Sequence, residues 1–280
     1  MSFNLLKTNQ EEKVSLISPK AVIDPSAVIG TNVSIGPYSI IGPNVEIGDN
    51  CKIGAHVIIE CNTMLGKNNH IHSFAALGGD PQDLTYTGEE TWLVVGDHNV
   101  IREYVSIHRG SMKENKKTII GDHNCFLAYS HVAHDCVVGN QTLFINNATL
   151  GGHVTLNNHV IIGAFVAVHQ FCRIGAYSFI AQAAQVSQDV PPYVMVAGTP
   201  SRPCGLNVIG LRRNGFDRQV IRALKEATII LYNREYLLAD ALEQLETLAI
   251  KTPQILPIID FVRSSKRGIS RKISQAESFI

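Results

Sequence analysis

Eleven histidines occur in the 280 residues, all of them within residues 56–169. His134, Gly152 and Gln170 recur at equal intervals of eighteen positions, and Asp135 follows His134 directly. An imidazole beside a carboxylate has the equipment of a general base. A glycine stacked on that imidazole leaves room for a substrate and offers a backbone N–H to a developing oxyanion. If the equal interval brings these positions together, they can deprotonate a nucleophile and support acyl transfer.

The interval of eighteen is three times a shorter period in the sequence. From Ile17 to Val186 an aliphatic residue or Phe occupies every sixth position, with two interruptions. A period of six fits neither an α-helix nor an open sheet, and it predicts a solenoid of short strands. Three hexads make one triangular coil, with the aliphatic side chains stacked inside at the strand spacing of about 4.8 Å. We expect the Gly or small polar residue that often follows to let the backbone turn each corner.

In such a solenoid, hexads separated by one full coil lie one above another on the same face. The positions of His134, Gly152 and Gln170 then form one column. Further polar residues are expected around this column: His131, Asp135, His153 and His169.

Other interpretations of this cluster are less favoured. Three or four imidazoles in reach could hold a metal ion, but histidines on a solenoid often point outward separately, so we expect no metal. Cys136 could be a catalytic thiol, although its place in the hexad favours packing. No Ser or Cys lies in a nucleophile motif, and the glycines recur at hexad corners rather than in a phosphate-binding loop. The chemistry implied is direct attack on a bound acyl donor, without a covalent enzyme intermediate.

The composition narrows the function classes. Lys and Arg balance Asp and Glu at 24 each, so no overall field favours nucleic acid. The six Cys include no CxxC pair, which favours a reducing compartment over a disulfide or zinc framework. No apolar stretch approaches the length of a membrane span, so we expect no membrane insertion and a cytoplasmic protein.

The pattern divides the chain into an N-terminal extension (1–16), a β-helix domain (17–190), and an extended link with a helical domain (191–280). The hexads break between Leu77 and Val95 and between Ile107 and Ile120. Loops that project from a regular scaffold favour substrate contact, although the second could equally be a tolerated insertion. We expect the strand ladder to end near Pro191 because proline cannot continue it. After the extended link, the pattern predicts two helices, each with one apolar face, and a third helix that begins at about Pro253. The faces comprise Val220, Ile221, Leu224, Ala227 and Leu231, then Leu238, Leu242, Leu245, Leu248 and Ala249.

Several segments are more specific than the hexads: His131–Asp135, Asn146–His153, Ala167–Phe171, Asp189–Val194, Gly205–Arg213, Pro81–Leu84 and Ile107–Gly110. Together they resemble the UDP-N-acetylglucosamine O-acyltransferases that begin lipid A synthesis in Gram-negative bacteria. The similarity covers nearly the whole chain, helical tail included. It implies an all-β left-handed parallel β-helix with a C-terminal α-helical domain. The left hand is an exception to the usual crossover rule and comes from the resemblance alone.

The resemblance also implies roles for the column. The histidine matching His134 takes the proton from the sugar 3-hydroxyl, and the aspartate matching Asp135 orients that histidine. The backbone N–H matching Gly152 holds the thioester oxyanion. The donor is an R-3-hydroxyacyl chain on the phosphopantetheine of acyl carrier protein, and no other cofactor is implied. The remaining substrate contacts match Gln82, Asp83, His131, His153, His169, Gln170, Gln182, Asn207 and Arg213.

Such enzymes are homotrimers with active sites between solenoids, and Asn207 and Arg213 match the contacts with the nucleotide. A basic patch would dock the acidic carrier protein. It would comprise Arg202, Arg212, Arg213, Arg218 and Arg222.

The sequence departs from the family pattern at three positions. Thr85 replaces a Lys, Ile209 a Glu that meets the ribose, and Asn214 a second Arg of the nucleotide site. The acceptor could therefore be the 3-amino analogue of the sugar, giving an amide. Gln182 falls at the acyl-length gauge, where a small residue is frequent, so we expect an acyl chain shorter than C14.

Three rival interpretations remain: two other transferases, and a structural β-helix of the ice-binding or carbonic-anhydrase-like kind. An N-acyltransferase of the same pathway carries an N-terminal uridine-binding domain, whereas only the short N-terminal extension precedes the first hexad here. An acetyl-CoA-dependent sugar acetyltransferase is disfavoured by Gly205–Arg213. A non-enzymatic ice-binding scaffold needs a repetitive Thr face, which the sequence lacks, and a zinc hydratase needs three His across a subunit boundary.

Overall fold

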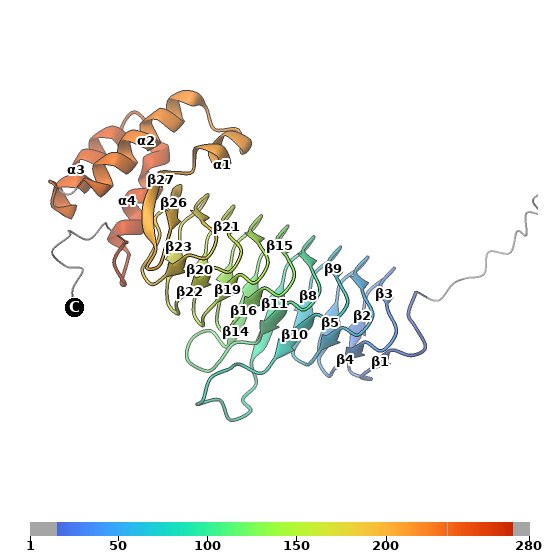
Figure 1. The fold of residues 1–280 in the computed structure, drawn as a ribbon. Coiled ribbons are helices and arrows are strands. Elements are labelled where there is room, and N and C mark those ends of the chain that lie inside the picture. Colours follow the sequence, from blue (N-terminus) through green and yellow to red (C-terminus); the bar gives the residue numbers. More distant parts are fainter. Residues whose placement is uncertain (1–15, 234, 271–280) are drawn as a thin grey trace, which may run out of the picture.

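The computed structural model describes residues 16–233 and 235–270. Their strands form three sheets that wind around one axis into a triangular prism, and the helices lie at its C-terminal end (Figure 1). Apart from the last two strands, strands that follow one another in the chain belong to different sheets, and each pairs with the strand one coil away. The fold is the parallel β-helix that the hexads predict.

The strands are short. The first sheet contains β1 (Val22–Ile23), β4 (Ile40–Ile41), β7 (Ile58–Ile59), β10 (Ala76–Gly79), β13 (Ser106–His108), β16 (His131–Val132), β19 (Thr149–Leu150), β22 (Ala167–Val168) and β25 (Gln185–Val186). The second contains β2 (Val28–Ile29), β5 (Val45–Ile47), β8 (Thr63–Leu65), β11 (Trp92–Val95), β14 (Lys117–Ile120), β17 (Val137–Val138), β20 (Thr155–Leu156) and β23 (Arg173–Ile174). The third contains β3 (Ser34–Ile35), β6 (Lys52–Ile53), β9 (His70–Ile71), β12 (Val100–Ile101), β15 (Cys125–Phe126), β18 (Leu143–Phe144), β21 (Ile161–Ile162), β24 (Phe179–Ile180), β26 (Val194–Ala197) and β27 (Arg202–Leu206).

The register of the ladder places the hexad positions over one another. Val132 pairs with Leu150, and Leu150 pairs with Val168. All three side chains are buried in one continuous core that fills the prism. Cys136 packs in the same core, and its burial raises the pKa of the thiol to about 12. A buried thiol of this kind is not a nucleophile, which agrees with the packing role expected for it.

The two interruptions of the hexads are loops inserted into single coils. Ile71 pairs with Ile101 and Ile107 with Val132, so both of these coils are longer than the regular coil of three hexads. The first insertion (residues 80–91) and the second insertion (residues 109–116) project from the same side of the prism (Figure 1).

The expected role of the corner glycines is wrong. The left-handed backbone conformation at the corners belongs to other residues, such as Asn50, Asp135 and His153, with φ near 60°. The glycines serve close approach between coils instead. A Cβ on Gly36 would lie 2.6 Å from the backbone nitrogen of Ala55 in the next coil. Glycine is needed there because no side chain fits between stacked backbones.

The ladder also continues past the two prolines. β26 pairs with β24 in parallel, and β27 then turns back antiparallel to β26. The helices that follow are α1 (Val208–Arg213), α2 (Arg218–Tyr232), α3 (Leu238–Ala249), the 3₁₀ turn η1 (Pro253–Ile255) and α4 (Leu256–Arg263). Their apolar faces form a second core around Leu224, Leu245 and Ile259.

The division at residues 16 and 190 remains our prediction, and residues 1–15 of the extension lie outside the described residues. Within the described ranges, no helix combines the length and apolar character needed to cross a membrane.

Candidate active site

His134 and Asp135 form a buried hydrogen-bonded pair at the corner that follows β16. His134 Nδ1 lies 2.8 Å from Asp135 Oδ2. Because a carboxylate only accepts, Nδ1 carries the proton in this bond, and Nε2 keeps a lone pair for a substrate hydroxyl. The φ of 60° at Asp135, which Asp tolerates better than most residues, turns the chain and holds the two side chains together.

Two further contacts hold Asp135, one at its carboxylate and one at its backbone. Its Oδ1 accepts the backbone N–H of Ser111 at 2.8 Å, and its own backbone N–H donates to Thr118 Oγ1 at 2.9 Å. Burial raises the pKa of Asp135, but the hydrogen bonds from His134 and Ser111 outweigh it, so the pKa lies below the usual value. The group is therefore an anion at neutral pH, as an orienting partner of an imidazole must be.

Gly152 packs directly on the His134 ring. A Cβ on Gly152 would lie 2.6 Å from Cε1 and 2.8 Å from Nε2 of His134. Any side chain there would displace the imidazole. In the part of the chain that the structure describes, the backbone N–H of Gly152 donates to no protein group, while its carbonyl accepts from Phe171.

An open cavity of about 420 Å³ lies against this pair. Four of the nine residues expected to meet the substrate line it. The coil period brings together those on β16 and beyond β22 because it places β16, β19 and β22 side by side. The lining residues are Gln82, His131, Ala133, His134, Thr149, Leu150, Gly151, Gly152, Val168, His169 and Gln170. Gln82 comes from the first insertion, so that loop contributes to the cavity wall.

His131 lines the cavity and packs against His108, and both side chains are partly buried. Their rings meet edge to face with centroids 4.9 Å apart, and Ser106 Oγ lies 2.7 Å from His131 Nδ1. Burial lowers the pKa of His131, and it lowers that of His108 to about 4, helped by the charges of His131, His134 and Arg109. Sequence reasoning missed His108, although it lies within the matching segment Ile107–Gly110.

His153 lies behind Asp135 rather than in the cavity wall. Its Nε2 is 3.8 Å from Asp135 Oδ2, and its Nδ1 is 3.4 Å from Glu114 Oε1. Its ring stacks on Phe171 with centroids 4.4 Å apart. Glu114 was not anticipated, since nothing in the hexads says where an insertion will lie.

The two insertions contact each other and the solenoid. Lys113 Nζ lies 2.6 Å from Asp83 Oδ2, and this ammonium, with hydrogen bonds from Thr85, keeps the pKa of Asp83 well below its usual range. The buried guanidinium of Arg109 donates to Gly78 O, to Asp80 and, at 3.1 Å, to the Tyr86 hydroxyl. Arg109 thus fastens the first insertion to the β-helix.

Three side chains here have the chemistry of a metal site. His134, Asp135 and His153 each offer a ligand atom within 4.8 Å of the others. In this arrangement, however, the Asp135 carboxylate already accepts a hydrogen bond from His134 Nδ1, so these two ligand atoms are engaged with each other. The prediction that the site works without a metal stays a prediction.

Asn207 and Arg213 lie elsewhere, in a second cavity of about 470 Å³. Strands of the third sheet and helix α1 line it, whereas the first cavity lies on the first sheet. Asn207 Oδ1 caps α1 by accepting from Gly210 N at 3.0 Å. Ile209 and Asn214, two of the departures, line the same cavity, and Asn214 Nδ2 donates to Gly210 O. One chain therefore does not bring the expected nucleotide contacts to His134.

Gln182 is exposed at the corner after β24 and lines neither cavity.

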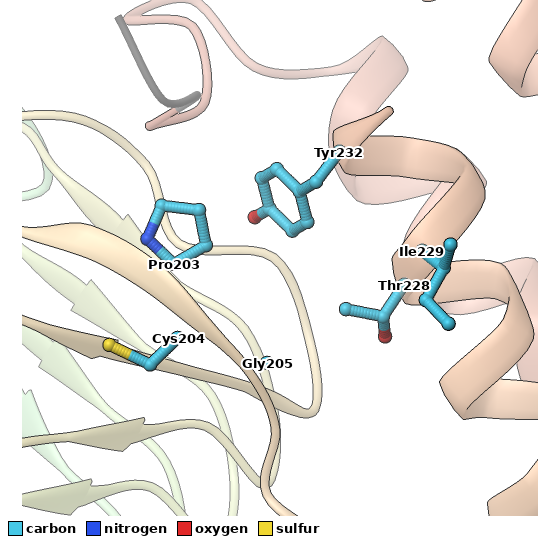
Figure 2. A pocket seen from close by; sticks show the side chains of 6 residues that line it. All are labelled: Pro203, Cys204, Gly205, Thr228, Ile229 and Tyr232. Carbon is cyan, nitrogen blue, oxygen red and sulfur yellow. The ribbon is translucent and has the colours of Figure 1, made fainter. Parts of the chain in front are cut away.

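A third cavity, about 200 Å³, lies between β27 and α2, where Tyr232 and Thr228 face Pro203 (Figure 2). Among the residues that the structure describes, no histidine or carboxylate lines this cavity, so they offer no acid–base pair there.

Comparison with known proteins agrees with this arrangement. A model described as UDP N-acetylglucosamine O-acyltransferase, domain 2, matches residues 189–270, and the bacterial transferase hexapeptide model matches residues 15–48, 26–61 and 44–79. The Acyl-[acyl-carrier-protein]--UDP-N-acetylglucosamine O-acyltransferase of Pseudomonas paraeruginosa is 44% identical over 258 residues, which are 92% of this chain and 100% of the relative.

Solved structures agree as well. The UDP-N-acetylglucosamine O-acyltransferase of Moraxella catarrhalis superposes with a TM-score of 0.89 at 44% identity, covering 91% of this chain and 100% of that one. The Francisella novicida UDP-N-acetylglucosamine acyltransferase gives 0.90 at 40% identity, covering 93% and 95%. The prism is thus the left-handed parallel β-helix that the resemblance implied. With this identity over nine-tenths of its length, the chain belongs to the UDP-N-acetylglucosamine O-acyltransferase family.

Proposed function

We propose that this protein transfers an R-3-hydroxyacyl chain from acyl carrier protein to the 3-hydroxyl of UDP-N-acetylglucosamine, the first step of lipid A biosynthesis, with His134 as general base. The observation that carries the proposal is the His134–Asp135 pair, 2.8 Å apart, with Gly152 packed on the imidazole at the edge of an open cavity.

The chemistry follows from these positions. His134 Nε2 takes the proton of the sugar hydroxyl as its oxygen attacks the thioester carbonyl. The Gly152 N–H, which has no protein acceptor among the described residues, stabilises the oxyanion. Collapse of this intermediate breaks the carbon–sulfur bond, and the imidazolium returns its proton to the phosphopantetheine thiolate. Asp135 stays ionised and stabilises the imidazolium.

Around this centre, Gln82, His131, His169 and Gln170 contact the substrates in the cavity. Asp83 supports the wall from the first insertion, and His153 supports Asp135 from behind. Gln182 limits the length of the acyl chain.

The working enzyme is a homotrimer in this proposal. The cavities of His134 and of Arg213 lie on different sheets of the prism. A substrate that meets both needs two chains, with the third-sheet face of one chain beside the first-sheet face of its neighbour. Asn207 and Arg213 then meet the nucleotide of a sugar that reacts at the neighbour's His134.

The donor docks at the C-terminal end. Exposed cations gather there on α1 and α2, and they complement an acidic carrier protein. They are Arg212, Arg213, Arg218 and Arg222, with the half-buried Arg202 on β27. The six cysteines are all free, which supports a reducing cytoplasm.

The test is an assay of the purified protein with 3-hydroxyacyl carrier proteins of several lengths and with UDP-N-acetylglucosamine or its 3-amino analogue. We expect turnover of the hydroxyl acceptor and a loss of at least about a hundredfold in kcat for His134→Ala. His123→Asn, at another corner that is exposed, should keep the wild-type rate. Turnover of the amino analogue alone would mean that the enzyme catalyses N-acylation instead of O-acylation.

A further inference from the structure

Four titratable side chains form a continuous row behind the cavity: Glu114, His153, Asp135 and His134. The separations are 3.4 Å from Glu114 Oε1 to His153 Nδ1, 3.8 Å from His153 Nε2 to Asp135 Oδ2, and 2.8 Å from Asp135 Oδ2 to His134 Nδ1. Carboxylate and imidazole alternate along the row. His134, Asp135 and His153 belong to the proposed site described above, whereas Glu114 has no part in it so far.

His153 can satisfy both of its neighbours in only one way. A neutral imidazole has one N–H and one lone pair, so one of the two carboxylates would face a lone pair. With a proton on each nitrogen, the ring is a cation between the two carboxylates, at ion-pair distances of 3.4 Å from Glu114 and 3.8 Å from Asp135. His153 is buried and stacked on Phe171, which restricts the ring plane. Removing either carboxylate therefore changes what the ring offers to the other.

The second insertion is tied to the site at three points. Ser111 donates its backbone N–H to Asp135, Lys113 pairs with Asp83, and Glu114 lies between these contacts and His153. Three cations, Arg173, Lys266 and Arg267, line a cavity of about 270 Å³ together with Glu114 and His153. The half-exposed Glu114 carboxylate thus lies in the same cavity as these cations and contacts His153.

We propose that Glu114 is a positioning residue: through His153 it holds the Asp135 carboxylate against His134. The second insertion is then part of the catalytic apparatus rather than a tolerated addition. This inference rests on the proposed function, because the pair that Glu114 supports is the proposed base.

The test compares Glu114→Ala and Glu114→Gln with Asn115→Ala, a neighbouring exposed residue of the same loop. We expect kcat to fall by about ten- to a hundredfold in both Glu114 variants, because misplaced catalytic groups cost rates of that size. The KM values of both substrates should stay within about twofold. In a His153→Phe background, which keeps an aromatic ring on Phe171, Glu114→Ala should cost nothing further.

A Glu114→Ala enzyme with a kcat within about twofold of wild type would overturn the proposal. So would an equal loss in both backgrounds. A second measurement is independent of turnover: ring ¹⁵N NMR signals of His153 should change in Glu114→Gln and not in Asn115→Ala, and unchanged signals would refute the contact itself. Absence of wild-type turnover would instead count against the proposed function.

Discussion

The ammonium of Lys113 lies 2.6 Å from the carboxylate of Asp83 and joins the two insertions of the β-helix. The other oxygen of Asp83 accepts from the Thr85 N–H and hydroxyl, at 3.0 and 2.9 Å. Thr85 stands where the family pattern has a lysine. The cation that pairs with the first insertion here is Lys113 of the second insertion.

Lys113→Ala should raise the KM for the sugar nucleotide about two- to fivefold with little change in kcat. The Lys113 end of this ion pair is exposed and the Asp83 side chain is nearly covered. The pair holds the loop that carries Gln82, so its loss should loosen one wall of the cavity. Steady-state kinetics with the acceptor varied would show this, with Lys117→Ala as the control for loss of an exposed lysine. A KM equal to that of the control would mean that the pair does not shape the cavity.

Gly152→Ala should abolish most of the activity, at least about a hundredfold in kcat, because its Cβ would push the His134 ring out of place. Gly139→Ala is a matched control at another corner, where a Cβ would lie 2.5 Å from Asn158 Oδ1. Both variants should melt at a lower temperature, and only Gly152→Ala should lose kcat. Equal rates in the two proteins would remove Gly152 from the site.

The period of three hexads was enough to predict the prism and the column of His134, Gly152 and Gln170, because a solenoid converts sequence spacing directly into distance. The period could not predict the contacts of Ser111, Lys113 and Glu114. They lie on an insertion, and a loop without a period has no register that would place it. The corner glycines were misread for a different reason: the period marks where they are, whereas their cause, the approach of the next backbone, is visible only in three dimensions.

His108 should make stability depend on pH. Burial lowers the pKa of His108 to about 4, whereas an unfolded histidine titrates near 6.5. Well above pH 6.5 the group is neutral in both states, and as pH falls through 6.5 toward 4 the unfolded chain takes up a proton that the folded chain does not. Stability is therefore lost over that range. The cost is about 1 kcal/mol at pH 5, after allowance for partial exposure.

His108→Gln should remove this component. Its melting temperature should fall less than that of the wild type between pH 7 and pH 5, by about 2–4 °C at fixed protein concentration. His123→Asn, which changes an exposed histidine, should follow the wild type. Parallel curves for all three proteins would show that His108 is protonated as readily in the folded chain as in the unfolded one.

Gln182→Gly should shift the donor preference toward longer acyl chains. Gln182 is exposed in the single chain, at the corner between β24 and β25, where the acyl groove of the proposed trimer would pass between neighbours. Each buried methylene contributes about 0.8 kcal/mol, so opening room for four more carbons should raise kcat/KM for C14 relative to C10 by at least about tenfold. Gln141→Gly, an equally exposed glutamine at another corner, controls for the loss of the side chain. Equal use of C14 and C10 donors by the wild type, or an unchanged ratio in Gln182→Gly, would show that this side chain does not set the acyl length.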